Sequence, residues 1–200
     1  MRAKPGAVLF DCDGVLVDSE PPARRIVWES LRDHGLEMDA EEMERRFTGG
    51  TMFDTLAQLR ALGIELPDDW PSRIYSRLYA ELAEGVPLIP GVETVLDRLD
   101  AAGIPYAVGS NGRPEKMRIT LGQHPSVWAR LEGRLFSGQE LGHPKPDPKL
   151  YLIAAAHLGV APDACVVIDD SVNGCTGGID AGMRVLGFAP EGTGAALAGL

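Results

Sequence analysis

Two carboxylates separated by one residue follow the first apolar run of the chain. Residues 7–10 (Ala-Val-Leu-Phe) are typical of a short buried strand, and Asp11 and Asp13 come directly after it. Gly14 then indicates that the strand has ended and that the backbone turns. Charged groups at the end of a buried strand lose hydration, so we expect a cation or a reaction to use them. A solvated acidic turn is the alternative, whereas the early Gly14 excludes the spacing of a calcium-binding EF-hand loop.

Further polar residues follow two other apolar runs. Ser110 and Asn111 come after one of them, Asp169 and Asp170 after another, and Lys145 lies in a proline-rich loop. Taken singly, each has an ordinary explanation: a turn, a helix N-cap or a solvated lysine. In a doubly wound sheet, however, the loops after the strands converge on one crevice. The combination therefore predicts one ligand-binding site at the carboxyl edge of a parallel sheet.

The elements that would position these residues fall into two groups. Residues 20–85 have only helical patterns, at about 20–34, 41–47, 51–62 and 70–83. From residue 92 onward helices alternate with strand-like runs at 104–109, 135–136, 165–168 and 184–188. This alternation predicts an α/β fold: a Rossmann-like parallel sheet core with helices on both faces, plus a small inserted all-α domain. The expected boundaries are 1–16 and 88–200 for the core and 17–87 for the insert.

Composition limits the class of protein. The chain has 200 residues, of which 44% are hydrophobic and 24% are charged, and this balance is ordinary for a globular protein. Its net charge of −10 opposes a nucleic-acid partner, and no apolar run is long enough for a membrane span. With three cysteines and no export signal, a reduced, cytoplasmic protein is expected, with a monomer as the default.

The motifs together resemble those of the haloacid dehalogenase (HAD) superfamily of phosphohydrolases. Its four motifs match Asp11-x-Asp13-Gly14, Ser110-Asn111, Lys145 and Asp169-Asp170, in that order along nearly the whole chain. The helical insert resembles the cap of the subfamily that contains phosphoglycolate phosphatase and β-phosphoglucomutase. The segments around Phe136, Lys145 and Asp169 look most like the 6-phosphogluconate and sugar-phosphate phosphatase branch. Members that remove halide lack the second aspartate, so Asp13 favours phosphoryl transfer.

The resemblance implies a role for each motif residue. Asp11 would be the nucleophile that forms an aspartyl-phosphate, and Asp13 would act as general acid and base, which requires its pKa to lie above that of Asp11. Mg²⁺ would be held by Asp11, the backbone carbonyl of Asp13 and Asp170, with Asp169 a direct or outer partner. Ser110, the backbone N–H of Asn111 and Lys145 would bind the phosphate group. The negative net charge then poses no conflict, because the cation and the local lysine invert the field at the site.

The insert would supply substrate selectivity. Its candidate residues lie in the loop 45–51, where Arg45 or Arg46 could meet a substrate carboxylate or a second phosphate, and Arg46 and Gly49 are taken as binding residues. Further candidates near the hinge are Ser19, Glu20 and Arg24. The expected substrate is a small phosphorylated metabolite, either a sugar phosphate or a phospho-sugar acid.

Two other activities share most of these motifs. A phosphosugar mutase of the β-phosphoglucomutase type carries a histidine where Ala23 stands here. A non-catalytic phosphometabolite-binding protein would lose the nucleophile or the acid, and Asp11 and Asp13 are both present. A phosphatase is therefore favoured. Members of the family usually continue with another strand and helix past the position of Leu200, so either the chain is shortened or the edge of the sheet is abbreviated.

Overall fold

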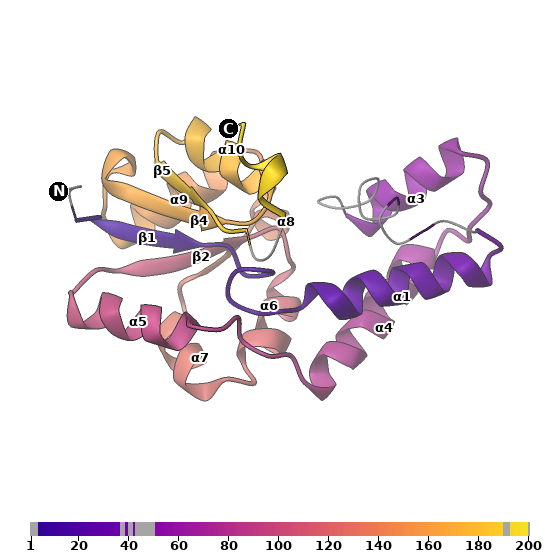
Figure 1. Ribbon diagram of the computed structural model, residues 1–200, viewed down its shortest axis with the longest axis horizontal. Helices are drawn as coiled ribbons and strands as arrows, with labels where there is room; N and C mark the ends of the chain where they lie inside the picture. The colour runs from indigo at the N-terminus through magenta and orange to yellow at the C-terminus, as the bar shows by residue number, and fades with distance from the viewer. Residues whose placement is uncertain (1–3, 37–38, 40–41, 43–50, 190–192, 200) are drawn as a thin grey trace. The chain divides into compact units, whose positions relative to one another are not determined.

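The computed structural model describes residues 4–36, 39, 42, 51–189 and 193–199. The chain divides into two compact units, one formed by residues 1–18 and 86–200 and the other by residues 19–85. The first unit is α/β and the second contains only helices among its described residues (Figure 1). Each unit is described on its own below.

The α/β unit contains a five-stranded parallel sheet in the order β3-β2-β1-β4-β5. Strand β1 (Ala7–Phe10) lies at its centre, and Leu9 is paired with Ala107 on one side and Val167 on the other. The remaining strands are β2 (Tyr106–Ser110), β3 (Leu135–Ser137), β4 (Cys165–Asp169) and β5 (Arg184–Gly187). All five predicted strands are present, and the predicted fold class is confirmed.

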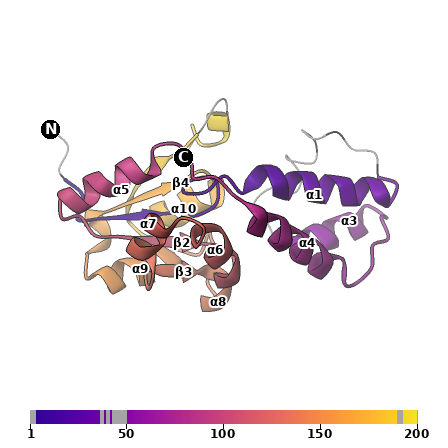
Figure 2. The ribbon, with the colours of Figure 1, turned by 90° about the horizontal axis from the view of Figure 1, so that it is seen from below.

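Helices cover both faces of this sheet because the strand order reverses after β3. Right-handed crossovers from β1 to β2 and from β2 to β3 advance toward one edge, whereas the crossover from β3 returns past β1 to β4. The helices of the first set therefore lie opposite those of the second, as Figures 1 and 2 show. The first set is α5 (Val92–Ala101), α6 (Pro114–Leu121) and α7 (Pro125–Leu131). The second set is α9 (Lys149–Leu158) and α10 (Val172–Asp180), and short turns add α8 (Gly138–Leu141), η1 (Pro162–Ala164) and η2 (Thr193–Ala196).

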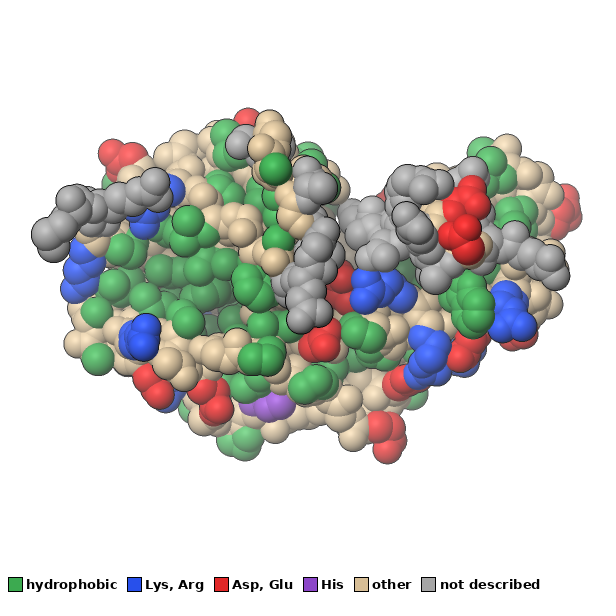
Figure 3. All heavy atoms as spheres, in the orientation of Figure 1, with side chains coloured by type: hydrophobic (Ala, Val, Ile, Leu, Met, Phe, Trp, Pro, Cys, Tyr) green, Lys and Arg blue, Asp and Glu red, His purple; other side chains and the backbone are tan. Residues whose placement is uncertain are grey.

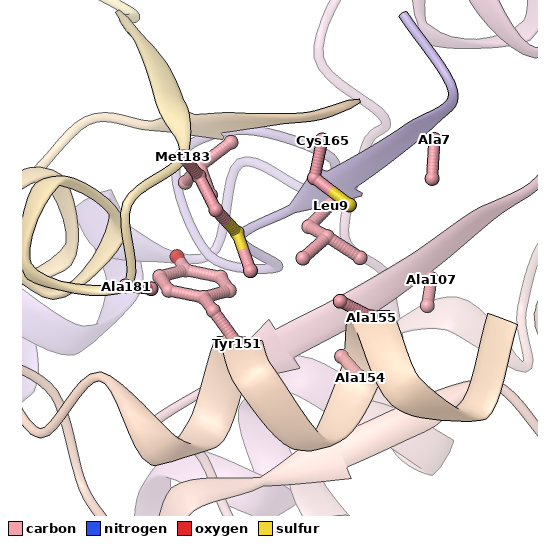
Figure 4. Packing of buried hydrophobic residues seen from close by; sticks show 10 residues of the cluster. Ala7, Leu9, Ala107, Tyr151, Ala154, Ala155, Cys165, Ala181 and Met183 are labelled. Atoms are coloured by element: carbon pink, nitrogen blue, oxygen red, sulfur yellow. The ribbon is translucent and has the colours of Figure 1, made fainter. Parts of the chain in front are cut away.

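The core between the sheet and α9 is built from alanines on the helix and from small and branched residues on the strands. Ala154 and Ala155 of α9 lie against Leu9, Ala107 and other strand residues, all of them buried (Figure 4). Small helix side chains allow α9 to approach the sheet closely, which fixes the position of its first turn. That turn carries Tyr151, whose ring is fully buried beside the site described below.

The opposite face is covered less completely near the edge strand β5. Figure 3 shows hydrophobic side chains gathered on the face of the α/β unit that carries β1 and α5 in Figure 1. Leu186 of β5 and Val95 of α5 are 44% and 41% exposed.

Among the described residues, no helix is both long and apolar enough to cross a membrane.

The helical unit contains α1 (Glu20–Asp33), α3 (Met52–Ala61) and α4 (Trp70–Glu84). Helices α1 and α4 pack together, and the buried indole N–H of Trp70 donates a hydrogen bond of 2.9 Å to Ser30 Oγ. The two helices are also joined by ion pairs of Arg25 with Glu81 and of Arg77 with Glu29. The helix predicted over 41–47 lies, apart from Glu42, outside the described residues.

Candidate active site

The site begins where β1 ends. Asp11 continues the strand by one residue, since its backbone N–H donates a hydrogen bond of 2.9 Å to the carbonyl of Ile168 in β4. The chain then turns at Gly14, whose φ of +75° suits glycine. A Cβ atom at Gly14 would lie 2.0 Å from a carboxylate oxygen of Asp170. Glycine is therefore required at position 14 for two reasons: the positive φ of the turn and the close approach of the loop that follows β4.

Lys145 joins two of the carboxylates. Its ammonium group donates to Asp11 Oδ1 at 2.6 Å and to Asp169 Oδ2 at 2.8 Å, and the lysine is only 6% exposed. The loop that carries Lys145 is held by Asn111: the amide oxygen of Asn111 accepts from the Lys145 N–H at 2.7 Å, and its NH₂ group donates to the Lys145 carbonyl at 3.2 Å. The Asn111 side chain thus positions the lysine.

Asp169 is completely surrounded by donors. Oδ2 accepts from Lys145 and from the hydroxyl of Tyr151 at 2.5 Å, while Oδ1 accepts from the N–H and the hydroxyl of Ser171 at 2.9 and 2.7 Å. A Cβ at Gly174 in α10 would lie within 2.2 Å of this carboxylate. Neither acid at this position caps α10, because the N-cap is Ser171, whose hydroxyl accepts from the Gly174 N–H at 3.0 Å.

The loop after β2 forms the opposite wall of the site. Ser110 is 1% exposed, and its hydroxyl oxygen accepts from the N–H of Gly112 at 2.9 Å. The loop is held from outside by Ser137, which donates to the Gly112 carbonyl at 2.8 Å, and by Gln139, which donates to the Asn111 carbonyl at 2.7 Å. Helix α6 starts directly after this loop. Its N-terminus is therefore available to an anion bound at Ser110.

A second lysine, which the sequence interpretation missed, lies beside Asp13. Lys116 Nζ is 2.8 Å from Asp13 Oδ1, and both side chains are less than one-fifth exposed. Burial opposes the charge of Lys116, but the Asp13 carboxylate outweighs burial and raises the pKa of Lys116 above its ordinary value. One feature of the sequence could have pointed to Lys116: it lies in the first turn of a predicted helix, where the helix dipole disfavours a cation.

The electrostatics of the two buried aspartates differ. Burial raises the pKa of Asp11 well above its ordinary value, and the opposing effect of Lys145 is not enough to restore it. Burial also opposes ionisation of Asp169, but Lys145, Tyr151 and Ser171 outweigh it and hold the pKa of Asp169 below its ordinary value. The pKa of Lys145 lies well above its usual range because Asp11 and Asp169 outweigh its burial. Further positive charge near Asp11 would favour its ionised form.

The carboxylates form a group that could hold a metal ion. Carboxylate oxygens of Asp11, Asp169 and Asp170 all lie within 4.8 Å of one another. With Asp13, the site has four carboxylates and two lysines, so two negative charges remain to be balanced. A divalent cation with oxygen ligands fits both this charge and the need to keep Asp11 ionised.

The structure thus brings together every predicted residue of the α/β unit: Asp11, Asp13, Ser110, Asn111, Lys145, Asp169 and Asp170. The predicted residues of the insert have a different outcome. Arg46 and Gly49 lie outside the described residues. Glu20 and Arg24 form an exposed ion pair of 3.8 Å in the first turns of α1, and Ser19 before them is buried.

The protein is thus an α/β protein with a lysine-bridged carboxylate cluster at the carboxyl edge of its parallel sheet. A family model described as haloacid dehalogenase-like hydrolase matches residues 5–182. The 6-phosphogluconate phosphatase of Escherichia coli is 34% identical to this chain, covering 92% of it and 83% of the relative. Hexitol phosphatase A of the same organism is 31% identical, covering 93% of this chain and 83% of the relative.

A solved structure agrees with these matches. A HAD family hydrolase from Deinococcus radiodurans, with bound phosphate and sodium, is 35% identical and superposes with a TM-score of 0.76, covering 94% of this chain and 82% of its own. The chain therefore belongs to the haloacid dehalogenase-like hydrolase family, and within it to the phosphatases.

Proposed function

We propose that this protein is a Mg²⁺-dependent phosphatase of a small sugar phosphate or phospho-sugar acid, acting through an aspartyl-phosphate on Asp11. The observation that carries the proposal is the Lys145 ammonium group between Asp11 and Asp169, next to Asp170. This arrangement supports the proposal, because a carboxylate acting as nucleophile would lie beside positive charge at the edge of the sheet where ligands bind.

The reaction would proceed in two transfers. An oxygen of Asp11 attacks phosphorus, the bond from phosphorus to the ester oxygen breaks, and Asp13 gives a proton to the leaving alcohol. A water molecule then attacks the phosphorus of the aspartyl-phosphate and gives a proton to Asp13. The bond between phosphorus and the Asp11 oxygen breaks, so that inorganic phosphate leaves and the Asp11 carboxylate is restored. Ser110, the Asn111 N–H and Lys145 bind the non-bridging phosphate oxygens, on which charge accumulates.

The metal would be held by Asp11, Asp170 and the backbone carbonyl of Asp13. When bound, Mg²⁺ would neutralise charge on the nucleophile and on the phosphate oxygens. Asp169 is better placed as an outer partner, because each of its oxygens already accepts two hydrogen bonds and has no lone pair left for a ligand bond. Its role would be to position Lys145.

Substrate selection is assigned to the helical unit, residues 19–85, which we propose acts as a cap. Arg46 and Gly49 remain the proposed selectivity residues of its loop. The names of the E. coli relatives support a phosphorylated sugar or sugar acid as substrate. The three cysteines are unpaired thiols, which suits a reducing compartment, and we propose a monomer in the cytoplasm whose partner is its metabolite.

The test is release of inorganic phosphate from 6-phosphogluconate, hexose phosphates, phosphoglycolate and β-glucose 1-phosphate, with Mg²⁺ or with a chelator. Asp11→Asn runs beside the wild type. We expect metal-dependent release that the substitution lowers by at least about a thousandfold. Isomerisation of β-glucose 1-phosphate without phosphate release would instead establish a mutase. Binding of these esters without any turnover would establish a non-catalytic protein.

A further inference from the structure

The site contains two lysines, and each pairs with different carboxylates. Lys145 binds Asp11 and Asp169, whereas Lys116 lies 2.8 Å from Asp13. Lys145 comes from the loop before α9, on one face of the sheet, and Lys116 comes from α6, on the other. The acid–base carboxylate therefore has a cationic partner of its own.

Lys116 occupies an unfavourable position for a lysine. It is the third residue of α6, in the first turn, where the positive end of the helix dipole repels a cation. Its side chain is only 16% exposed, so the ammonium group has also lost most of its hydration. A buried ion pair adds little net stability after these costs, so stability alone does not account for this lysine.

The surroundings of the pair connect it to the phosphate-binding loop. A Cβ atom at Gly112 would lie 3.1 Å from the Ser110 hydroxyl, 3.4 Å from Asp13 Oδ2 and 3.6 Å from Cδ of Lys116. These three side chains therefore converge on the one position in the loop that has no side chain. Asp13 therefore faces this glycine with Oδ2 and the Lys116 ammonium group with Oδ1.

We propose that Lys116 is a positioning residue for Asp13: it fixes the carboxylate at the distance from the phosphate loop at which a proton can pass to and from the ester oxygen. This inference rests on the proposed phosphatase function. An aspartate side chain has two rotatable bonds, and a general acid must lie within hydrogen-bond reach of the atom that it protonates. The contact with Lys116 restricts these rotations before the substrate binds.

Loss of Lys116 should change the kinetics in a specific way. A lysine that acts only through Asp13 affects the steps in which a proton moves, so it changes kcat and leaves KM for the ester almost unchanged. It also matters more for a sugar phosphate, whose alkoxide must be protonated on leaving, than for para-nitrophenyl phosphate, whose leaving group is stable as an anion. A lysine that bound the leaving group directly would instead change KM.

The experiment compares Lys116→Met, which keeps most of the stem without the charge, with Lys116→Arg and the wild type. Arg118→Met is the matched control, because Arg118 is an exposed cation on the same helix. If Lys116→Met fails to fold, Lys116→Gln replaces it. Steady-state kinetics on the best sugar phosphate are combined with the pre-steady-state burst of nitrophenolate, which reports formation of the aspartyl-phosphate alone.

We expect Lys116→Met to lower kcat on the sugar phosphate about ten- to hundredfold, with KM changed less than about twofold. The nitrophenolate burst rate should change less than about threefold, Lys116→Arg should recover much of kcat, and Arg118→Met should match the wild type. An unchanged kcat, a rise in KM alone, or a nitrophenolate burst rate lowered as much as kcat on the sugar phosphate would overturn the proposal. Absence of phosphate release by the wild type would instead refute the proposed function itself.

Discussion

At the scale of single residues, the site is a chain of side chains that fix one another. Lys145 donates hydrogen bonds to Asp11 and Asp169, and Tyr151 and Ser171 donate to Asp169. Because each buried charge has a charged or hydrogen-bonding partner, the group tolerates burial that would otherwise neutralise it. Loss of an outer member should therefore act on catalysis through the inner ones.

Tyr151→Phe tests the outer end of this chain. The substitution keeps the buried ring and removes the hydroxyl that donates to Asp169 Oδ2 at 2.5 Å. Burial raises the pKa of Tyr151 well above its ordinary value, so the hydroxyl is protonated and donates at neutral pH. We expect the free energy of unfolding to fall by about 1.5–3 kcal/mol and kcat to fall about tenfold.

Tyr106→Phe is the control for that variant. Tyr106 is also buried, and its hydroxyl donates to Asp100 Oδ1 at 2.8 Å, in a pair that includes none of the site residues. It should lower stability in a chemical-denaturation curve and leave kcat unchanged. Equal kcat for Tyr151→Phe and the wild type would show that Asp169 needs no help from the tyrosine.

Some single residues of the site could not be predicted from the sequence. Lys116 and Tyr151 were not predicted, because a lysine or tyrosine on a helix has many possible partners and only the packed structure selects one. Tyr151 lies six residues after Lys145, yet its hydroxyl meets Asp169 only because α9 packs closely on the sheet. The motif carboxylates were predictable because they follow apolar strands directly.

At the scale of elements, the strands and most helices could be predicted from local patterns. Buried parallel strands are short apolar runs, and β1 and β4 have uninterrupted apolar sequences before their aspartates. The start of α10 was less certain, since Asp169, Asp170 and Ser171 can all cap a helix. The structure selects Ser171, because Asp169 is engaged by Lys145. That choice depends on a residue 24 positions away.

Helix α3 begins at a capping box formed by Thr51 and Asp54, and the contribution of this box to stability should depend on pH. The Thr51 hydroxyl accepts from the Asp54 N–H at 3.2 Å, and Asp54 accepts from the Thr51 N–H at 2.8 Å. Hydrogen bonds from the Thr51 hydroxyl and backbone hold the pKa of Asp54 below its ordinary value. A lowered carboxyl pKa contributes stability above the unfolded pKa, and this contribution is lost as pH falls through the folded pKa.

Thr51→Ala should therefore lower the free energy of unfolding by about 1 kcal/mol at neutral pH. The difference from the wild type should begin to shrink below about pH 4, where Asp54 becomes protonated in the unfolded state. It should shrink further as pH falls through the lower pKa of Asp54 in the folded state. Thermal melts across this range measure it, with Ser76→Ala as an exposed control in α4. If Thr51→Ala lowered the free energy of unfolding equally at about pH 3 and at about pH 7, the assigned role of Asp54 would be contradicted.

At the scale of the molecule, the segments that connect the two units are paired inside the α/β unit. The Asp18 N–H donates to the Pro87 carbonyl at 2.9 Å, and the Ile89 N–H donates to the Leu16 carbonyl at 2.9 Å. Val17 and Leu88 form an antiparallel bridge between these bonds. Two neighbouring antiparallel segments can be joined by a tight turn.

Replacement of residues 19–85 by an Asn-Gly turn should therefore leave a folded α/β unit. All the predicted residues of that unit's site remain, so we expect turnover of para-nitrophenyl phosphate with Mg²⁺, whereas the preference among sugar phosphates should largely disappear. Circular dichroism and the ratios of kcat/KM measure these outcomes. A folded core with unchanged preferences would show that selectivity does not come from the helical unit.

The central claim is a covalent phosphoryl group on Asp11, and chemical trapping tests it most directly. The enzyme is mixed with substrate and Mg²⁺, quenched, and treated with borohydride, which reduces an aspartyl-phosphate to homoserine. Peptide mass spectrometry should then find homoserine at position 11 in the wild type and none in a sample without substrate. Phosphate release without any modified Asp11, or homoserine at another aspartate, would contradict the account.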